Sequence, residues 1–276
     1  MIKDIIVNLT VDALRDIAGD YALSVARTFE AHVAGIGFAY EPVIPGSIFG
    51  NVAAELVQGE RIKSENAARG AISNFEAASR RLGLSPESRL LPASPAEAAD
   101  MFGRLARRFD LSVVAQAEPR SLPGRELIIE AALFESGRPV LVVPYIEQDG
   151  LRLDRVMLCW DGTRNAARAA ADAMPFLRRA KAVEVVVVAG EAGKSDELPG
   201  ADIAQHLARH GLTIEVKRIV SGGIDVANTV LSYAADSAVD FIVMGGYGHS
   251  RLREFILGGA TRGILTSMTV PVLMSH

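Results

Sequence analysis

The segment Asp240-Phe241-Ile242-Val243-Met244-Gly245-Gly246-Tyr247-Gly248 joins an apolar run directly to a glycine-rich turn. After nine further residues, a second cluster, Gly258-Gly259-Ala260-Thr261, leads into a stretch of helical character. An apolar run followed by a turn and a helix is typical of a strand in a parallel sheet that is covered on both faces. We therefore expect a parallel strand that ends near Gly245 and a helix that begins near Ala260.

The same order of elements occurs twice along the 276 residues. In each half an apolar run, a polar turn and an alanine-rich helical stretch are followed by a second apolar run, and a proline precedes or opens a closing apolar run. The paired segments are 5–9 and 156–160, 14–30 and 164–180, 32–39 and 183–189, 94–115 and 225–245, and 139–143 and 271–274. This alternation predicts an α/β chain of two tandem domains with parallel sheets.

The boundary between the halves is predicted in the short polar stretch 145–153, which gives domains 1–147 and 151–276. The first half has an additional loop after its second apolar run and a long helical stretch at 52–82. The second half has the loop 190–200 and a shorter helical stretch at 201–210 at this place.

Composition narrows the class of protein. The formal net charge of -4 provides no basic surplus for neutralising many phosphates, so we expect no nucleic-acid partner. No apolar run approaches the roughly 18 residues that span a bilayer, so we expect no membrane partner. The segment Met1–Asp4 lacks the apolar region of a signal peptide, and the single cysteine, Cys159, allows no intrachain disulfide. These features predict a cytoplasmic protein.

The two glycine clusters have a plausible chemical purpose. Without a Cβ atom, glycine lets backbone N–H groups approach an anion closely, and the helix that follows adds the positive end of its dipole. The spacing differs from a Walker A loop, because no Gly-Lys-Ser/Thr follows, and from a dinucleotide fingerprint, because it lies in the last strand–helix unit. Taken alone, the pattern leaves phosphate binding and simple turns both open.

The spacing Gly245-x2-Gly248-x9-Gly258, between Val243-Met244 and the closing run 270–274, resembles the ATP-binding signature of the universal stress protein family, G-x2-G-x9-G-[S/T]. The run 156–160 with its Asp-Gly-Thr turn is similar to the family's first strand. The resemblance covers residues 154–276 and, more faintly, the first half. It implies that each half is a five-stranded, mostly parallel sheet flanked by helices, of the adenine nucleotide alpha hydrolase-like type.

The resemblance also implies a ligand: ATP, ADP or AMP, with or without Mg²⁺, in the second domain. The family's phosphate-loop glycines fall on Gly245, Gly248 and Gly258. Its strand-end residue near the ribose falls on Met244, and its aspartate beside adenine and ribose falls on Asp161. With the start of the following helix, the implied set is Asp161, Met244, Gly245, Gly248, Gly258, Gly259, Ala260 and Thr261. For Asp161, a turn and helix cap remains the alternative.

One position departs from the family pattern. Gly259 stands where the family has Ser or Thr, which removes a hydroxyl donor to a phosphate oxygen. A neutral hydrogen bond contributes about 0.5–1.5 kcal/mol, so the loss weakens binding roughly tenfold at most. Thr261, two residues on, could supply a substitute hydroxyl.

The first half lacks the glycine signature. Its first strand ends in Asn8-Leu9-Thr10 in place of the aspartate-bearing turn, and Gln116–Arg120 contains Glu118, which repels phosphate, and Pro119, which lacks an N–H donor. This half is interpreted as a degenerate domain that offers an interaction surface or a different pocket.

Two functions stay open at this point. The first is a nucleotide-binding sensor or regulator of a stress response, and the second is a ligand-free protein-interaction module. No catalytic residues are identified, because the histidines lack metal-ligand spacing and no Gly-x-Ser-x-Gly elbow occurs. Slow ATP hydrolysis is a third idea that lacks an identifiable general base.

The closing apolar runs 140–143 and 272–274 come last in their sheets. An exposed apolar edge strand promotes aggregation unless it is paired. We therefore expect these two strands to pair antiparallel within one chain, as an intrachain pseudo-dimer. A homodimer of chains is compatible with this arrangement.

Overall fold

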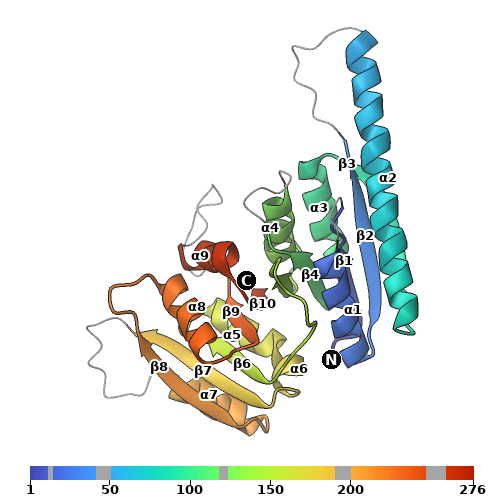
Figure 1. The fold of residues 1–276 in the computed structure, drawn as a ribbon. Helices are drawn as coiled ribbons and strands as arrows, with labels where there is room; N and C mark the ends of the chain where they lie inside the picture. The colour runs from blue at the N-terminus through green and yellow to red at the C-terminus, as the bar shows by residue number, and fades with distance from the viewer. Residues whose placement is uncertain (12–14, 42–50, 118–123, 190–199, 247–258) are drawn as a thin grey trace. The chain divides into compact units, whose positions relative to one another are not determined.

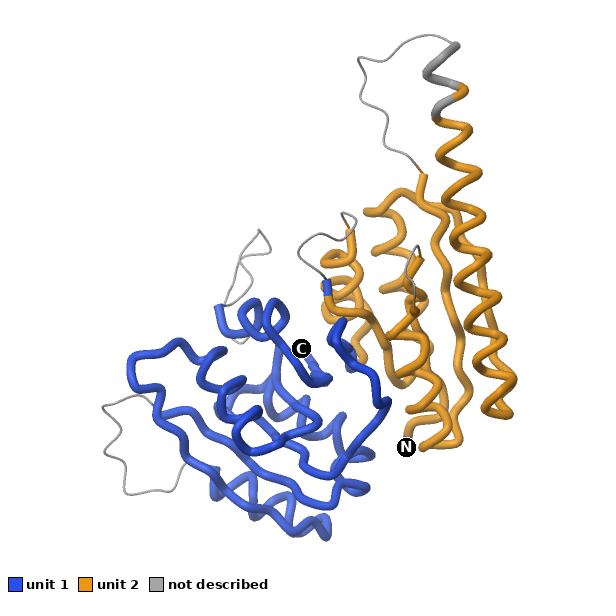
Figure 2. The backbone as a smooth tube through the Cα atoms, viewed as in Figure 1, with its two compact units in different colours: residues 1, 117–119, 139–276 blue, residues 2–116, 120–138 orange. Residues whose placement is uncertain are grey.

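The computed structural model describes residues 1–11, 15–41, 51–117, 124–189, 200–246 and 259–276. The chain separates into two compact units, which are coloured in Figure 2. The N-terminal unit comprises residues 2–116 and 120–138. The C-terminal unit comprises Met1, residues 117–119 and residues 139–276.

The N-terminal unit contains a parallel sheet in the order β3-β2-β1-β4 (Figure 1). Its strands and helices are β1 Asp4–Asn8, α1 Ile17–Phe29, β2 His32–Tyr40, α2 Asn51–Arg81, β3 Glu87–Ala93, α3 Pro95–Ala106, β4 Leu111–Ala115 and α4 Arg125–Glu135. The central strand β1 is buried on both faces, as its continuous apolar sequence predicts.

The C-terminal unit contains strands in the order β5-β10-β9-β6-β7-β8. Its elements are β5 Val140–Val143, β6 Arg155–Cys159, α5 Arg164–Asp172, α6 Met174–Leu177, β7 Ala182–Ala189, α7 Ala201–Arg209, β8 Ile214–Val220, α8 Val226–Asp236, β9 Phe241–Gly245, α9 Gly259–Ser267 and β10 Val272–Ser275. Within the described residues, each half of the sequence supplies five strands, and the α/β class with mostly parallel pairing is confirmed.

The two closing strands, β5 and β10, pair antiparallel, as expected from the sequence. The register places Val272 opposite Val142 and Met274 opposite Val140. On its other side β10 pairs in parallel with β9, so its backbone groups find partners on both sides. The side chains of β5 are buried, and β10 is an interior strand of the C-terminal unit.

The duplication extends to individual hydrogen bonds. In the N-terminal unit the Asp110 carboxylate accepts hydrogen bonds from the backbone N–H groups of Lys3 and Asp4, at 2.8 and 3.1 Å. In the C-terminal unit the Asp240 carboxylate accepts from the N–H groups of Asp154 and Arg155, at 2.9 and 3.3 Å. Each aspartate directly precedes a strand, β4 or β9, and fixes the start of the neighbouring strand, β1 or β6.

The helical stretch expected at 164–180 is two helices. Helix α5 ends at Asp172, and α6 begins at Met174 with Pro175 in its first turn. Proline has no N–H to continue the hydrogen-bond ladder of a preceding helix, so the chain restarts there.

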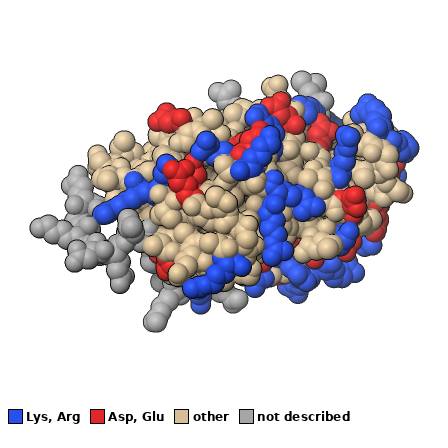
Figure 3. Space-filling model, turned by 90° about the horizontal axis from the view of Figure 1, so that it is seen from below, with Lys and Arg blue, Asp and Glu red and all other residues tan. Residues whose placement is uncertain are grey.

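The surface in Figure 3 carries charges of both signs, with Asp and Glu side chains lying between Lys and Arg side chains. Many of the described charges form exposed pairs, such as Arg152 with Asp154 at 3.3 Å and Lys181 with Asp154 at 2.6 Å. Within the described ranges, no helix is both long and apolar enough to cross a membrane.

The interior position of β10 predicts a contrast between two valine substitutions. V272K places a charge at a fully buried position and should lower the free energy of unfolding by roughly 3 kcal/mol or more. V220K, at a position that is 60% exposed at the end of β8, should change it by no more than about 0.5 kcal/mol. Urea unfolding followed by the fluorescence of Trp160, the only tryptophan, reports on the C-terminal unit. Equal unfolding midpoints for the two variants would contradict this placement of β10.

Candidate functional site

The strand order of the C-terminal unit defines a place where ligands bind in open sheets. Strand β6 comes first in the sequence among its parallel strands, β7 and β8 lie on one side of it, and β9 and β10 lie on the other. From β6 the chain continues outward to β7 and β8 and then returns to place β9 on the opposite side of β6, so the strand order reverses between β6 and β9. Open α/β sheets bind ligands outside the carboxyl ends of the strands at such a switch point.

The turn after β6 holds an exposed carboxylate in a fixed position. Asp161 Oδ1 accepts hydrogen bonds from Thr163 N at 3.0 Å and from Thr163 Oγ1 at 2.7 Å. Thr163 is in turn the N-cap of α5, and its Oγ1 accepts from Ala166 N at 3.2 Å. Gly162, between them, has φ of 74°, a conformation that favours glycine. Oδ2 of Asp161 has no hydrogen-bond partner in the described part of the chain and is open to a ligand.

Gly245, at the end of β9, is required for packing. A Cβ atom on this residue would lie 2.6 Å from Ala166 N and 2.7 Å from the carbonyl carbon of Asn165. The missing side chain therefore lets the end of β9 contact the first turn of α5. The sequence pattern suggested a phosphate contact for this glycine, and the structure adds a role in joining the two elements that border the site.

A polar cluster around the buried Asn165 side chain ties this contact to β10. Asn165 is 4% exposed, and its Nδ2 donates to the carbonyl oxygen of Gly246 at 2.6 Å. The Nδ1 atom of His276 lies 3.0 Å from Asn165 Nδ2 and 3.1 Å from the same carbonyl oxygen. Gly246 N donates to the Ser275 carbonyl at 2.8 Å. Sequence reasoning missed Asn165 and His276, although an asparagine in the first turn of an alanine-rich helix was a signal.

Helix α9 begins at Gly259, as the sequence predicted to within one residue. A Cβ atom on Gly259 would meet no atom of the described residues within 4 Å. Thr261 is 4% exposed, so the residue that could have replaced the family's hydroxyl is buried. Met244 is 9% exposed, and Ala260 is partly exposed. Gly248 and Gly258 lie outside the described residues.

The cysteine beside the site is not poised for chemistry. Burial, and then the nearby Asp161 carboxylate, raise the pKa of the Cys159 thiol to about 12, so it stays protonated at neutral pH. Among the described residues, no group of three His, Cys, Asp or Glu side chains is placed to hold a metal ion.

The comparison with protein families covers this half of the chain. A family model described as the universal stress protein family matches residues 152–276. Residues 152–276 belong to the universal stress protein family. The matched segment contains the turn after β6, α5, β9, α9 and β10, which are the elements that form the candidate site.

Curated relatives match shorter segments. The chain is 33% identical over 67 residues to a universal stress protein of Synechocystis sp. and 35% identical over 60 residues to one of Methanocaldococcus jannaschii. These segments are 24% and 22% of this chain, and they span only 22% and 36% of the two relatives.

A solved structure matches the whole chain. A universal stress protein from Archaeoglobus fulgidus shares the fold with a TM-score of 0.70 over 99% of this chain and 97% of its own, at 15% identity. The likeness at this identity concerns the fold, and it covers both halves, in agreement with a tandem arrangement.

The different surroundings of two glycines lead to a prediction about stability. G245A introduces a methyl group into contact with α5 and should lower the free energy of unfolding by about 1–3 kcal/mol. G259A adds the same methyl group at a helix start where no described atom lies within 4 Å, and it should leave stability unchanged or raise it by up to about 1 kcal/mol. Denaturant unfolding followed by Trp160 fluorescence compares the two. If G245A proved as stable as G259A, the packing role of Gly245 would be wrong.

Proposed function

We propose that the C-terminal unit of this universal stress protein binds an adenine nucleotide, ATP, ADP or AMP, at the carboxyl ends of β6 and β9. The observation that carries the proposal is the fixed, exposed Asp161 carboxylate at the switch point of a sheet that lies within the family segment. Binding there would make the chain a sensor or regulator in a stress response.

Each part of the site suits one part of the nucleotide. The open Oδ2 of Asp161 is an acceptor for ribose hydroxyls or the adenine amine. The backbone N–H groups in the first turn of α9 and the positive end of its helix dipole suit the phosphates. Among the described residues, Gly259 leaves room for an oxygen to approach these groups.

A nucleotide in this position would connect two segments that are far apart in the sequence, the turn after β6 and the start of α9. Ligand binding to the folded state stabilises it by about 2.7 kcal/mol when the ligand concentration is a hundred times Kd. The order and stability of α9 would then follow the nucleotide concentration. This coupling is the physical basis on which a sensor could work.

Equilibrium binding to the full chain tests the proposal. ATP, ADP and AMP, each with and without Mg²⁺, are titrated into protein stripped of carried-over ligand. D161N removes the charge from the acceptor and should weaken binding by roughly ten- to a hundredfold, since hydrogen bonds to charged groups contribute about 1.5–3 kcal/mol. D236N makes the same chemical change at the exposed C-terminal end of α8 and should leave the affinity unchanged. Affinity weaker than millimolar for all three nucleotides would refute the proposal.

The departure at Gly259 allows a gain-of-affinity test. G259S restores the family's hydroxyl at a position with room for it and should tighten ATP binding by up to roughly tenfold. G259A controls for any effect of the added carbon on the helix and should bring no gain. Calorimetric titration of both variants at the same pH gives the comparison. Equal affinities of the two variants would show that the start of α9 does not contact the phosphates.

A second function, a ligand-free interaction module, is favoured by two observations. The family hydroxyl is absent at Gly259, and Thr261 is buried. Mass spectrometry of small molecules released from the natively purified chain distinguishes the two functions. An adenine nucleotide in the released fraction would exclude the ligand-free module, and its absence together with failed titrations would favour it.

A further inference from the structure

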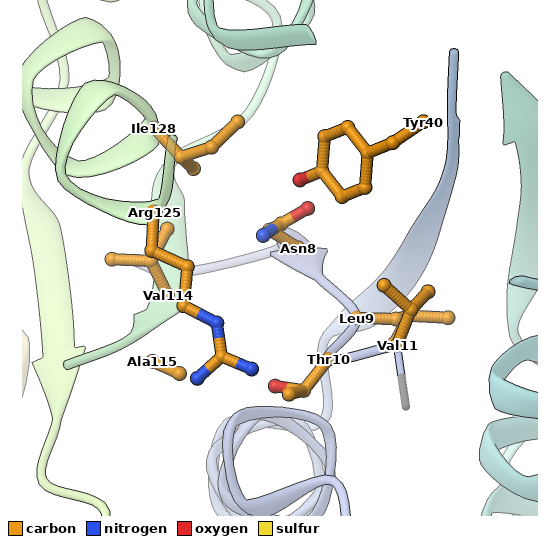
Figure 4. Close-up of a pocket in the computed structure, with 9 residues that line it drawn as sticks. All are labelled: Asn8, Leu9, Thr10, Val11, Tyr40, Val114, Ala115, Arg125 and Ile128. Atoms are coloured by element: carbon orange, nitrogen blue, oxygen red, sulfur yellow. The ribbon is translucent and has the colours of Figure 1, made fainter. Parts of the chain in front are cut away.

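The N-terminal unit has a pocket at its own switch point. Strand β1 comes first in the sequence, β2 and β3 lie on one side of it, and β4 lies on the other. The pocket is lined by the end of β1 and the residues after it, by the ends of β2 and β4, and by the first turn of α4 (Figure 4). It therefore occupies the place where an open sheet binds ligands.

The groups in this pocket differ from those in the C-terminal unit. Thr10 is the second residue after β1, whereas the second residue after β6 is Asp161. The last residue of β4 is Ala115, whereas the last residue of β9 is Gly245. The pocket thus lacks both the carboxylate and the glycine pattern on which the nucleotide proposal depends.

Asn8 provides an unsatisfied acceptor in the pocket. Its Oδ1 atom is buried and has no hydrogen-bond partner among the described residues. A buried polar atom without a partner is costly, and most such atoms in folded proteins are satisfied. Asn8 Oδ1 therefore suits a hydrogen-bond donor that the described residues do not supply.

Arg125 provides a positive charge in the same pocket. It is the first residue of α4, so its charge adds to the positive end of the helix dipole. The N-cap residue, Gly124, contributes no side-chain hydrogen bond to this helix end. Figure 4 shows its guanidinium group directed toward Thr10. None of the described lining residues is acidic.

Tyr40 keeps its hydroxyl proton. Burial raises the pKa of Tyr40, and the positive charge of Arg125 lowers it to a smaller extent. The phenol group therefore stays neutral and can donate or accept a hydrogen bond. The side chain of Thr10, by contrast, already hydrogen-bonds to the Asp16 carboxyl group.

We propose that this pocket binds a small organic molecule that carries a single anionic group, a carboxylate or a phosphate monoester, together with a hydrogen-bond donor. Arg125 holds the anionic group, and Asn8 Oδ1 accepts from the donor. A polyphosphate is disfavoured, because no glycine-rich turn follows β4 to bring backbone N–H groups around it. The site is independent of the nucleotide site proposed for the C-terminal unit.

Four probes test the chemistry on the full chain by calorimetry or ligand-observed NMR. They are acetate, L-lactate, inorganic phosphate and glycerol 3-phosphate. We expect lactate to bind more tightly than acetate and glycerol 3-phosphate more tightly than phosphate, because the added hydroxyl is a donor for Asn8. If lactate binds more tightly than glycerol 3-phosphate, the preferred anionic group is a carboxylate; if the order is reversed, it is a phosphate monoester. Failure of all four to bind at roughly 10 mM would overturn the proposal.

Matched variants locate the binding. R125M should weaken the affinity for the tightest-binding probe by about ten- to a hundredfold. R108M, at an exposed arginine beyond the end of α3, should leave this affinity unchanged. Saturating ATP and the D161N variant should both leave probe binding intact. Equal binding by R125M and R108M, or displacement of the probe by ATP, would overturn the proposal.

N8L separates a ligand contact from a structural role. It replaces an unsatisfied polar group, so the ligand-free variant should have an unchanged or higher midpoint of thermal unfolding. Its affinity for the hydroxyl-bearing probe should fall by about tenfold, to the level of the probe without the hydroxyl. A lower unfolding midpoint with unchanged affinity would show that Asn8 acts only in the fold.

Discussion

The close approach of β9 to α5 at Gly245 is the contact on which the second half of the chain depends. Because no Cβ atom separates the strand from the helix, the backbone of Gly246 comes within reach of the Asn165 amide, and through it of His276 after β10. The first turn of α5 is the same turn that Thr163 caps and that Asp161 orients. One missing side chain thus couples the end of β9, the end of β10 and the carboxylate of the candidate site.

The two units show how one architecture can retain its scaffold while its sites diverge. Asp110 and Asp240 make equivalent hydrogen bonds at the amino ends of the sheets, where they serve the fold. At the carboxyl ends the equivalent positions carry different chemistry: Asp161 and Gly245 in one unit, and Thr10 and Ala115 in the other. Since these aspartates act at the amino ends of the strands, the residues at the carboxyl ends, where ligands bind, can change without loss of the sheet.

The strands buried on both faces were predictable from sequence because their apolar runs are continuous. Strands β3 and β8 were not identified individually, because their exposure varies along the strand and hides the apolar pattern. In the site, the turn at Asp161 was predictable from local residues. The packing role of Gly245 and the cluster of Asn165 with His276 were not predictable, because these residues meet only in the folded sheet. Gly245 lies 80 positions from Asn165 in the sequence, and His276 lies 111 positions from it. For the pocket in the N-terminal unit, the signal in the sequence was the replacement of the aspartate-bearing turn by Asn8-Leu9-Thr10.

The central claim is that the switch point of the C-terminal unit is a nucleotide site. Hydrogen–deuterium exchange of the full chain, with and without saturating ATP, tests it most directly, because it reports on each unit separately. The account predicts slower exchange in peptides that contain the turn at Asp161 and the start of α9, with no change in peptides around Asn8. Unchanged exchange at both segments of the C-terminal unit, or protection confined to the N-terminal unit, would contradict it.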